Sequence, residues 1–331
     1  MIPISIVTGF LGAGKTTLIA RLLRNPAFTR TAVIVNEWGE VGLDHELIAT
    51  SDETLVTLAT GCLCCRVRSD LVTTLLDLAR RRQKGVIGPY DRVLVETSGL
   101  ADPAPILQAL IGDFDVAAGH AIDTVLTLVD TQHGTATLAQ HAEARRQVAL
   151  ADRLLLTKTD VAAADPRLRN RLAELNPGAT VLAAIRGEIA PGDLFIGADP
   201  AVRARRLAAL PGFGAGFPRA DHTSGIDTII LERDSPIPAL ALAMWLEALA
   251  EHCGPRLLRV KGLVDVVEMP DQPAVVHAVR HVVAEPDWLE SWPSPDHRTR
   301  VVIIAEGVPP HFPLRLLEAI EAEVRETTGQ P

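Results

Sequence analysis

Residues 9–16 read Gly9-Phe10-Leu11-Gly12-Ala13-Gly14-Lys15-Thr16 and fit the pattern G-x-x-x-x-G-K-[ST]. The stretch follows a short apolar segment, Ile4–Thr8, and precedes a helical pattern over Thr17–Arg24. Its glycines let the backbone turn so that successive N–H groups point at phosphate oxygens, and the helix N-terminus adds about half a positive charge. The sequence therefore predicts a strand, a phosphate-binding loop and a helix, in that order. The alternative is a glycine-rich turn that binds nothing.

The side chains of this loop have distinct expected roles. We expect Lys15 to reach the β and γ phosphates of a nucleotide and the Thr16 hydroxyl to bind Mg²⁺, which takes few protein ligands and keeps several waters. The nucleotide-binding residues expected here are Gly9, Gly12, Ala13, Gly14, Lys15, Thr16 and Thr17.

The first part of the chain alternates short apolar strand patterns with longer helical ones. The strands we expect are Ile4–Thr8, Ala32–Asn36, Leu55–Leu58, Arg92–Glu96, Thr124–Val129, Arg153–Thr157 and Thr180–Leu182. Helical spacing covers Arg66–Arg82, Leu138–Leu150 and Leu168–Leu175. Near-continuous Val, Ile and Leu runs are typical of strands buried on both faces, so the pattern predicts an α/β domain with a mostly parallel sheet.

A second unit follows a stretch rich in proline and glycine. We place the first domain at residues 1–190, a linker at 191–221 and a smaller domain at 222–331. The strands expected in the second domain are Thr228–Glu232, Leu257–Leu263, Ala274–Val283 and Arg300–Ile304, and the helices are Pro238–Cys253 and Phe312–Arg325. Strands in quick succession between two helices favour an α+β domain with a mainly antiparallel sheet.

Composition excludes several classes of protein. The 331 residues are 47% hydrophobic and 22% charged, and no apolar run approaches the roughly 20 residues that cross a bilayer. The opening residues lack a basic segment and a cleavage site, so we expect a cytoplasmic protein without a secretory signal. A net charge of −9 argues against a nucleic-acid binder, which needs clustered basic surface.

Two further motifs belong with the phosphate loop. The segment Arg92–Glu96 is a strand that ends in an acid, so Glu96 is the candidate for the carboxylate that supports Mg²⁺, and Gly99 is a candidate N–H donor to the γ-phosphate. The segment Thr157-Lys158-Thr159-Asp160 fits T-K-x-D after another strand. We expect Asp160 to accept hydrogen bonds from guanine and the Lys158 stem to cover the base. The usual motif has Asn where Thr157 stands.

Three of the four cysteines lie in Gly61-Cys62-Leu63-Cys64-Cys65, between a strand and a helix. The cluster is therefore expected at the same end of the sheet as the phosphate loop. Two or three thiolates at this spacing can hold Zn²⁺ or another thiophilic ion, with a further ligand from elsewhere. Buried structural cysteines and a redox pair are the alternatives. Cys253 stands alone, and we expect it to be a small core residue.

The chain resembles the CobW-like metal-chaperone GTPases, relatives of the UreG and HypB nickel-insertion GTPases. Four motifs in the first domain carry the resemblance: Gly9–Thr17, Asn36–Asp44, Gly61–Cys65 and Glu96–Pro103. In the second domain, Leu257–Gly262 and Val276–His281 look like the C-terminal domain of the family. Two residues depart from the pattern of the family, because Thr157 replaces Asn and Trp38 replaces Phe.

The resemblance implies GTP hydrolysis coupled to delivery of a transition metal, with Cys62, Cys64 and Cys65 as metal ligands and Glu37–Asp44 as a switch segment. Glu37 and Glu40 are candidates for orienting the attacking water. Either could instead be a metal ligand, a role for which we favour Glu37, or a solvated loop carboxylate.

The leading hypothesis is therefore a GTP-hydrolysing metallochaperone that binds GTP or GDP, Mg²⁺ and a transition metal. Zn²⁺ is favoured as that metal, with Co²⁺ and Ni²⁺ as alternatives. The expected partners are a client metalloprotein and, as one candidate assembly, a second copy of the chain. A P-loop kinase of a small molecule and a non-hydrolysing metal-binding regulator are the two rival hypotheses.

Overall fold

The computed structural model describes residues 1–35, 55–57, 65–163, 165–184, 189–196, 201–202, 204 and 225–328, and of residues 55–57, 65–69 and 191 it describes the backbone alone. The chain divides into two compact units. The first consists of Met1–Ala173 and Ala179–Ala198, and the second of Glu174–Gly178 and Asp199–Pro331. The predicted linker lies mostly outside the described residues, so the domain boundaries stay a prediction.

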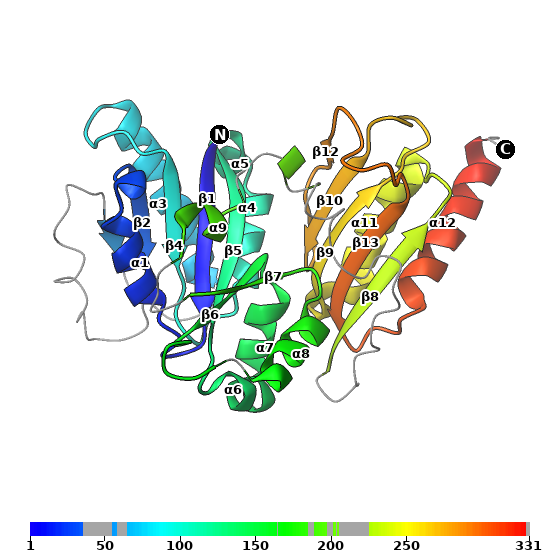
Figure 1. Cartoon of the computed structure of the whole chain (residues 1–331). Helices are drawn as coiled ribbons and strands as arrows, with labels where there is room; N and C mark the ends of the chain where they lie inside the picture. Colours follow the sequence, from blue (N-terminus) through cyan, green and yellow to red (C-terminus); the bar gives the residue numbers. More distant parts are fainter. Residues whose placement is uncertain are drawn as a thin grey trace. The chain divides into compact units, whose positions relative to one another are not determined.

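The first unit contains a seven-stranded sheet in the order β3-β2-β4-β1-β5-β6-β7 (Figure 1). All neighbouring strands pair in parallel, as the apolar runs predicted. The strands are β1 (Ile2–Gly9), β2 (Thr31–Val35), β3 (Leu55–Thr57), β4 (Arg92–Glu96), β5 (His120–Asp130), β6 (Arg153–Thr157) and β7 (Thr180–Ala183). Because β1 lies between β4 and β5, the loop that follows β1 is flanked by the carboxyl ends of both neighbours.

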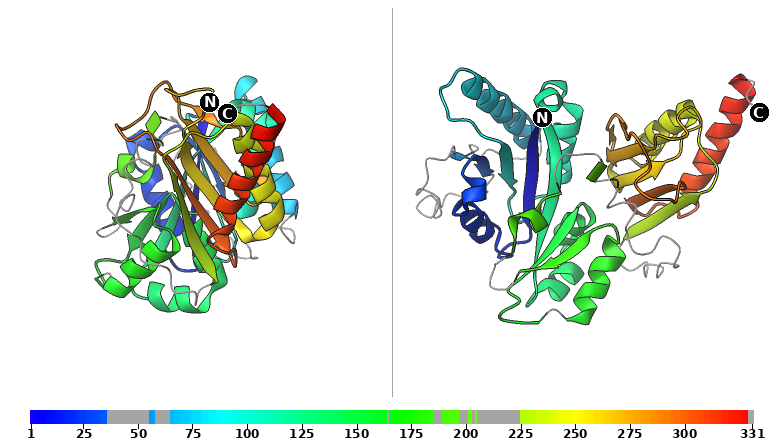
Figure 2. Two further views of the ribbon diagram at one scale, coloured as in Figure 1. Left: turned by 90° about the vertical axis from the view of Figure 1, so that its right-hand side faces the viewer. Right: turned by 45° about the horizontal axis from the view of Figure 1, so that its top comes forward.

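Helices cover both faces of this sheet (Figures 1 and 2). They are α1 (Lys15–Leu23), α3 (Cys65–Gln83), α4 (Ala104–Gly112), α5 (Phe114–Gly119), α6 (Gly134–Gln140), α7 (Ala142–Ala149), α8 (Pro166–Leu175) and α9 (Pro191–Leu194), with a short 3-10 helix at Pro26–Phe28. Apolar side chains of α1 join those of the strands in the core, which also contains Leu194 of α9.

The prediction of one continuous helix over Leu138–Leu150 is wrong. The pattern over Leu138–Leu150 predicts one helix, whereas the structure has α6 and α7 with His141 between them in an extended conformation (φ −116°, ψ 119°). Two contacts explain the break. The Arg145 guanidinium donates to the carbonyls of Leu138 and Ala139 at 2.9 and 3.2 Å, which satisfies the end of α6. The His141 ring also lies 4.4 Å from the Phe10 ring, measured between centroids.

The second unit has an antiparallel sheet in the order β11-β10-β9-β13-β8, with β12 paired to β10. Its strands are β8 (Ile226–Arg233), β9 (Leu257–Val264), β10 (Ala274–Val279), β11 (Val282–Val283), β12 (Asp287–Trp288) and β13 (Thr299–Glu306). Its helices are α11 (Ala239–Cys253) and α12 (Phe312–Thr328), with a short 3-10 helix at Gly254–Arg256. The predicted fold class, a parallel α/β domain followed by an α+β domain, is confirmed.

The helices α11 and α12 cover one face of the second sheet. Trp245 is fully buried in this core, and its indole N–H donates to the Pro313 carbonyl at 2.8 Å. Cys253 lies in the same core, as expected, and burial raises the pKa of its thiol.

The predicted strand Ala274–Val283 is instead a hairpin. Val279 pairs with Val282 across a turn at Arg280 and His281, and Arg280 has a positive φ of 53°. The run contains no glycine or proline to mark the turn, and valines stand on both sides of it.

Within the described ranges, no helix combines the length and the apolar character needed to cross a membrane.

Candidate functional site

The loop after β1 turns sharply toward α1. Gly9 has φ 143°, and a Cβ atom there would lie 2.5 Å from the Leu128 carbonyl oxygen of β5, so another side chain would clash with backbone. Gly14 has φ 94° at the N-cap of α1, a conformation that side-chain-bearing residues rarely adopt. The loop therefore ends at a helix N-terminus whose N–H groups are available to an anion.

Lys15 spans the loop. Its side chain is buried, and its Nζ donates to the carbonyls of Gly9 and Phe10 at 2.9 and 3.4 Å. The ammonium group is thus held on the loop itself, where a phosphate would enter. Thr17, two residues further along α1, is exposed.

Thr16 and Glu96 come together from different elements. The register Val7↔Glu96 between β1 and β4 places Glu96 next to the end of β1. The Thr16 hydroxyl donates to Glu96 Oε1 at 2.9 Å, and Glu96 is 3% exposed. A buried carboxylate is costly unless it is paired or binds a cation. The hydroxyl and carboxylate oxygens at this position therefore form a donor set that suits Mg²⁺.

The segment after β4 packs directly on the loop. Thr97 Oγ1 donates to Thr8 Oγ1 at 2.7 Å. A Cβ atom on Gly99 would lie 2.8 Å from the Leu11 nitrogen and 2.9 Å from its Cα, so glycine permits this close approach. Gln147 of α7 holds the segment, because its Nε2 donates to the carbonyls of Gly99 and Ala101 at 3.1 and 3.0 Å.

The carboxyl end of β6 is tied to the same loop. Thr157 Oγ1 donates to the Ala13 carbonyl at 2.9 Å. Lys158 has φ 58°, and its Nζ lies 2.7 Å from Asp130 Oδ2 at the end of β5. Asp160 is exposed.

A cavity of about 190 Å³ lies beside these groups. Its wall includes Phe10 and Gly12 of the loop, Asp130, Lys158 and Gln147. The loop and the T-K-x-D segment, which are far apart in the sequence, therefore face a common space.

Three polar residues of the site were not identified from the sequence. They are Asp130, which pairs with Lys158; Thr131, whose hydroxyl lies 2.9 to 3.1 Å from the carbonyls of Thr157, Lys158 and Ala162; and Gln147. For Asp130 and Thr131 a signal exists, because polar residues that directly follow a buried parallel strand lie at the ligand-binding edge of the sheet. Gln147 gives no such signal within a helical pattern.

Most of the predicted metal site lies outside the described residues. Glu37, Glu40, Cys62 and Cys64 are not described, and of Cys65 the structure describes the backbone alone, as the first residue of α3. Among the side chains that are described, no group of three or more His, Cys, Asp or Glu is placed to hold a metal ion. The Cys-x-Cys-Cys site thus stays a prediction.

The fold and the loop together define a P-loop nucleotide-binding domain joined to an antiparallel α+β domain. Family models match both parts: the CobW/HypB/UreG nucleotide-binding domain over residues 3–183, and the C-terminal domain of the cobalamin synthesis protein cobW over residues 226–321. The chain belongs to the CobW/HypB/UreG family, as its resemblance implied.

Individual relatives are similar over long stretches. The zinc chaperone YjiA of Escherichia coli (strain K12) is 34% identical over 308 residues, which cover 93% of this chain and 95% of YjiA. The zinc-regulated GTPase metalloprotein activator 1 of Saccharomyces cerevisiae is 31% identical over 206 residues, covering 53% of this chain and 46% of the yeast protein. The crystal structure of the Zn(II)-bound YjiA GTPase from E. coli matches with a TM-score of 0.73 at 29% identity, covering 96% and 98% of the two chains.

Proposed function

We propose that the protein hydrolyses GTP and couples this hydrolysis to delivery of Zn²⁺ to a client protein. The observation that carries the nucleotide part is the arrangement of Lys15 across the loop and of Thr16 against buried Glu96. Membership of the family supports this part, and the zinc part rests on relatives named zinc chaperones and on a Zn(II)-bound GTPase of similar structure.

In the proposed mechanism, the phosphates of GTP occupy the loop and Lys15 exchanges its contacts with the Gly9 and Phe10 carbonyls for the β and γ phosphates. The Gly99 N–H donates to the γ-phosphate, and Thr16 and Glu96 hold Mg²⁺. When bound, Mg²⁺ neutralises charge that develops on the phosphate oxygens. We assign the water-orienting role to Glu40.

Guanine is proposed to bind at the carboxyl end of β6. The Lys158–Asp130 ion pair fixes the Lys158 stem that would cover the base, and Asp160 is exposed and able to accept hydrogen bonds. An exposed Asp160 carboxylate would pair with guanine N–H groups that adenine lacks. This arrangement favours GTP over ATP.

The proposed metal cargo binds to the thiolates of Cys62, Cys64 and Cys65, with Glu37 as a further ligand. Thiolates and a carboxylate suit Zn²⁺ and also accept Co²⁺ or Ni²⁺. If the switch segment supplies Glu37, the γ-phosphate and the metal act on one segment, and hydrolysis would then change metal affinity.

Phosphate release from the purified protein tests the enzymatic part and separates the rivals. We expect Mg²⁺-dependent release from GTP in preference to ATP, and its loss in Lys15→Ala. Phosphorylation of a small-molecule acceptor without release of free phosphate would instead support a kinase. Binding of GTP with no turnover in the presence or absence of Zn²⁺ would support a non-hydrolysing regulator.

A further inference from the structure

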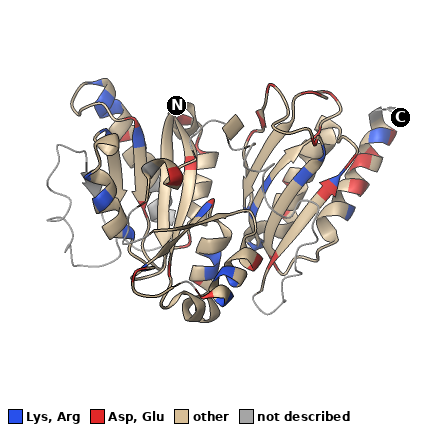
Figure 3. Cartoon of the chain, in the orientation of Figure 1, with Lys and Arg blue, Asp and Glu red and all other residues tan. Residues whose placement is uncertain are grey.

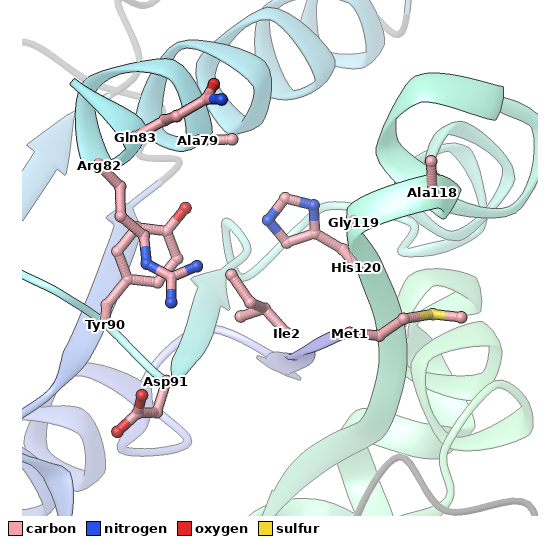
Figure 4. A pocket seen from close by; sticks show the side chains of 10 residues that line it. All are labelled: Met1, Ile2, Ala79, Arg82, Gln83, Tyr90, Asp91, Ala118, Gly119 and His120. Atoms are coloured by element: carbon pink, nitrogen blue, oxygen red, sulfur yellow. The ribbon is translucent and has the colours of Figure 1, made fainter.

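A second cavity lies at the amino-terminal edge of the parallel sheet (Figure 4). It has a volume of about 700 Å³ and is lined by the start of β1, the end of α3, the residues before β4 and the junction of α5 with β5. Ile2 of its wall begins β1, whereas Gly9 of the phosphate loop ends it. The seven residue steps from Ile2 to Gly9 separate the two sites by roughly 23 Å, at about 3.3 Å per step.

Two polar side chains of this cavity are buried, and one of them has no hydrogen-bond partner among the described residues. Tyr90 is 2% exposed and His120 is 5% exposed. The Tyr90 hydroxyl and both ring nitrogens of His120 are covered from solvent. Within the described residues the hydroxyl has no hydrogen-bond partner, whereas the His120 ring has a long hydrogen bond to the Val116 carbonyl. Buried polar groups nearly always have a partner. The Tyr90 hydroxyl therefore indicates a missing partner that can accept its hydrogen bond.

The chemistry of the wall selects an anion. Burial raises the pKa of Tyr90, so its hydroxyl stays protonated and can donate. Burial also lowers the pKa of His120 against the smaller opposing effect of a hydrogen bond to the Val116 carbonyl, so the ring is neutral and that carbonyl accepts from its one N–H. The Arg82 guanidinium lies 5.1 Å above the centre of the Tyr90 ring.

Positive charge dominates the side of the cavity that the end of α3 forms. Arg82 belongs to a basic last turn of α3 (Figure 3), and Figure 4 shows Arg82 and Tyr90 on one side of the cavity with His120 facing them from β5. Among the described residues of the wall, the one acid, Asp91, is paired with Arg30 at 2.7 Å. Ile2 and Ala79 add apolar surface.

We propose that this cavity binds a small organic anion whose carboxylate or phosphate oxygens accept hydrogen bonds from Arg82 and Tyr90, next to the His120 ring. The apolar part of the anion lies against Ile2 and Ala79. Because Arg82 covers Tyr90 in the structure, its side chain swings away as the anion enters and then closes on it. This anion site is separate from the nucleotide site, and the proposal of it does not rest on the proposed function.

The test uses the full chain with labelled histidine, saturated with GDP and Mg²⁺ so that the phosphate loop is filled. Inorganic phosphate and benzoate are titrated separately while the ring signals of His120, assigned with His120→Gln, are followed by NMR. We expect a saturable shift of the His120 signals with at least one probe. The tighter of the two identifies a phosphate or a carboxylate ligand.

Three variants make the result specific. Tyr90→Phe keeps the packed ring and removes the hydroxyl, and Arg82→Ala removes the guanidinium. Each should weaken binding at least roughly tenfold, as expected for loss of a hydrogen bond to a charged group. Arg80→Ala removes an exposed charge from the same helix and should leave binding unchanged. The proposal is overturned if neither probe gives a saturable shift, or if Arg82→Ala binds as tightly as the wild type.

Discussion

Thr157 stands where the family commonly has Asn, and its hydroxyl donates to the Ala13 carbonyl of the phosphate loop. A hydroxyl cannot reproduce all the hydrogen bonds of an amide, but it can keep the bond that joins β6 to the loop. We infer that the substitution preserves the position of the loop and leaves guanine selection to Asp160.

Thr157→Val should therefore weaken GTP binding. The change keeps the shape of the side chain and leaves the Ala13 carbonyl without this donor, at a cost of about 1 kcal/mol or a roughly fivefold rise in Kd. Titration with a fluorescent GTP analogue measures the effect. Thr157→Ser keeps the hydroxyl and serves as the control. Equal affinity of the Val variant and the wild type would show that the bond does not position the loop.

Gly99→Ala should slow GTP hydrolysis more than it weakens GDP binding. The added Cβ would lie 2.8 Å from the Leu11 nitrogen, so the segment must move away from the loop and its N–H away from the γ-phosphate. Loss of a hydrogen bond to a charged group costs about 1.5–3 kcal/mol, which corresponds to a roughly 10–100-fold fall in kcat.

The matched control is Gly88→Ala, because a Cβ at Gly88 meets nothing within 4 Å. Single-turnover phosphate release and GDP titration separate the two effects. An unchanged kcat in the Gly99→Ala variant would refute the role assigned to Gly99.

At the scale of elements, the loop before β13 carries a charge cluster. Asp296 accepts from Arg298 Nε and Nη2 at 3.0 and 2.9 Å and also contacts Arg300. Hydrogen bonds from Arg298 lower the pKa of Asp296 to about 2, from its usual value near 4. Because the folded-state pKa is the lower one, the cluster stabilises the fold above pH about 4 and loses this effect as the pH falls toward 2.

Asp296→Asn should consequently lower stability at about pH 6, and the difference from the wild type should shrink as the pH falls from about 4 toward 2. Urea unfolding followed by tryptophan fluorescence gives the midpoints, with exposed Asp271→Asn as the control. A difference that does not change with pH would assign the effect to packing rather than to ionisation of Asp296.

Helices and strands with a clear hydrophobic period could be predicted from the sequence. The breaks that depend on contacts between side chains could not. The strand Arg92–Glu96 has the predicted bounds because a continuous apolar run ends in an acid. The break at His141 depends on Arg145 and Phe10, which are remote in the sequence or on the far side of the break. The turn at Arg280 and His281 interrupts a run of valines without a turn residue.

The candidate site likewise combines residues that a local sequence pattern defines with residues that tertiary contacts bring into place. The positions of Lys15, Thr16 and Glu96 could be predicted, because a fixed motif and the carboxyl end of a strand define them. The place of Asp130 at this edge could also be predicted, because it directly follows a buried strand, but its ion pair with Lys158 depends on the order of the strands. Gln147 could not be predicted, because its role arises from packing between α7 and the segment after β4.

In the proposed function, the molecule binds two ligands, GTP and a transition metal, that both act on the switch segment Glu37–Asp44. The family identity and the P-loop fold account for nucleotide binding, whereas the coupling to metal rests on the proposed ligands Cys62, Cys64, Cys65 and Glu37. Cys64→Ala should lose tight Zn²⁺ binding while GDP binding, measured by titration, stays unchanged. Retention of Zn²⁺ affinity in this variant would place the metal elsewhere.

The most direct test of the account is the Zn²⁺ affinity of the full chain, measured by competition with a chromogenic chelator in the presence of Mg²⁺ with GDP or with a non-hydrolysable GTP analogue. If hydrolysis drives metal delivery, the two affinities should differ by roughly 5–150-fold, the range of typical coupling between sites. Equal affinities in the two nucleotide states would contradict a GTP-driven metallochaperone.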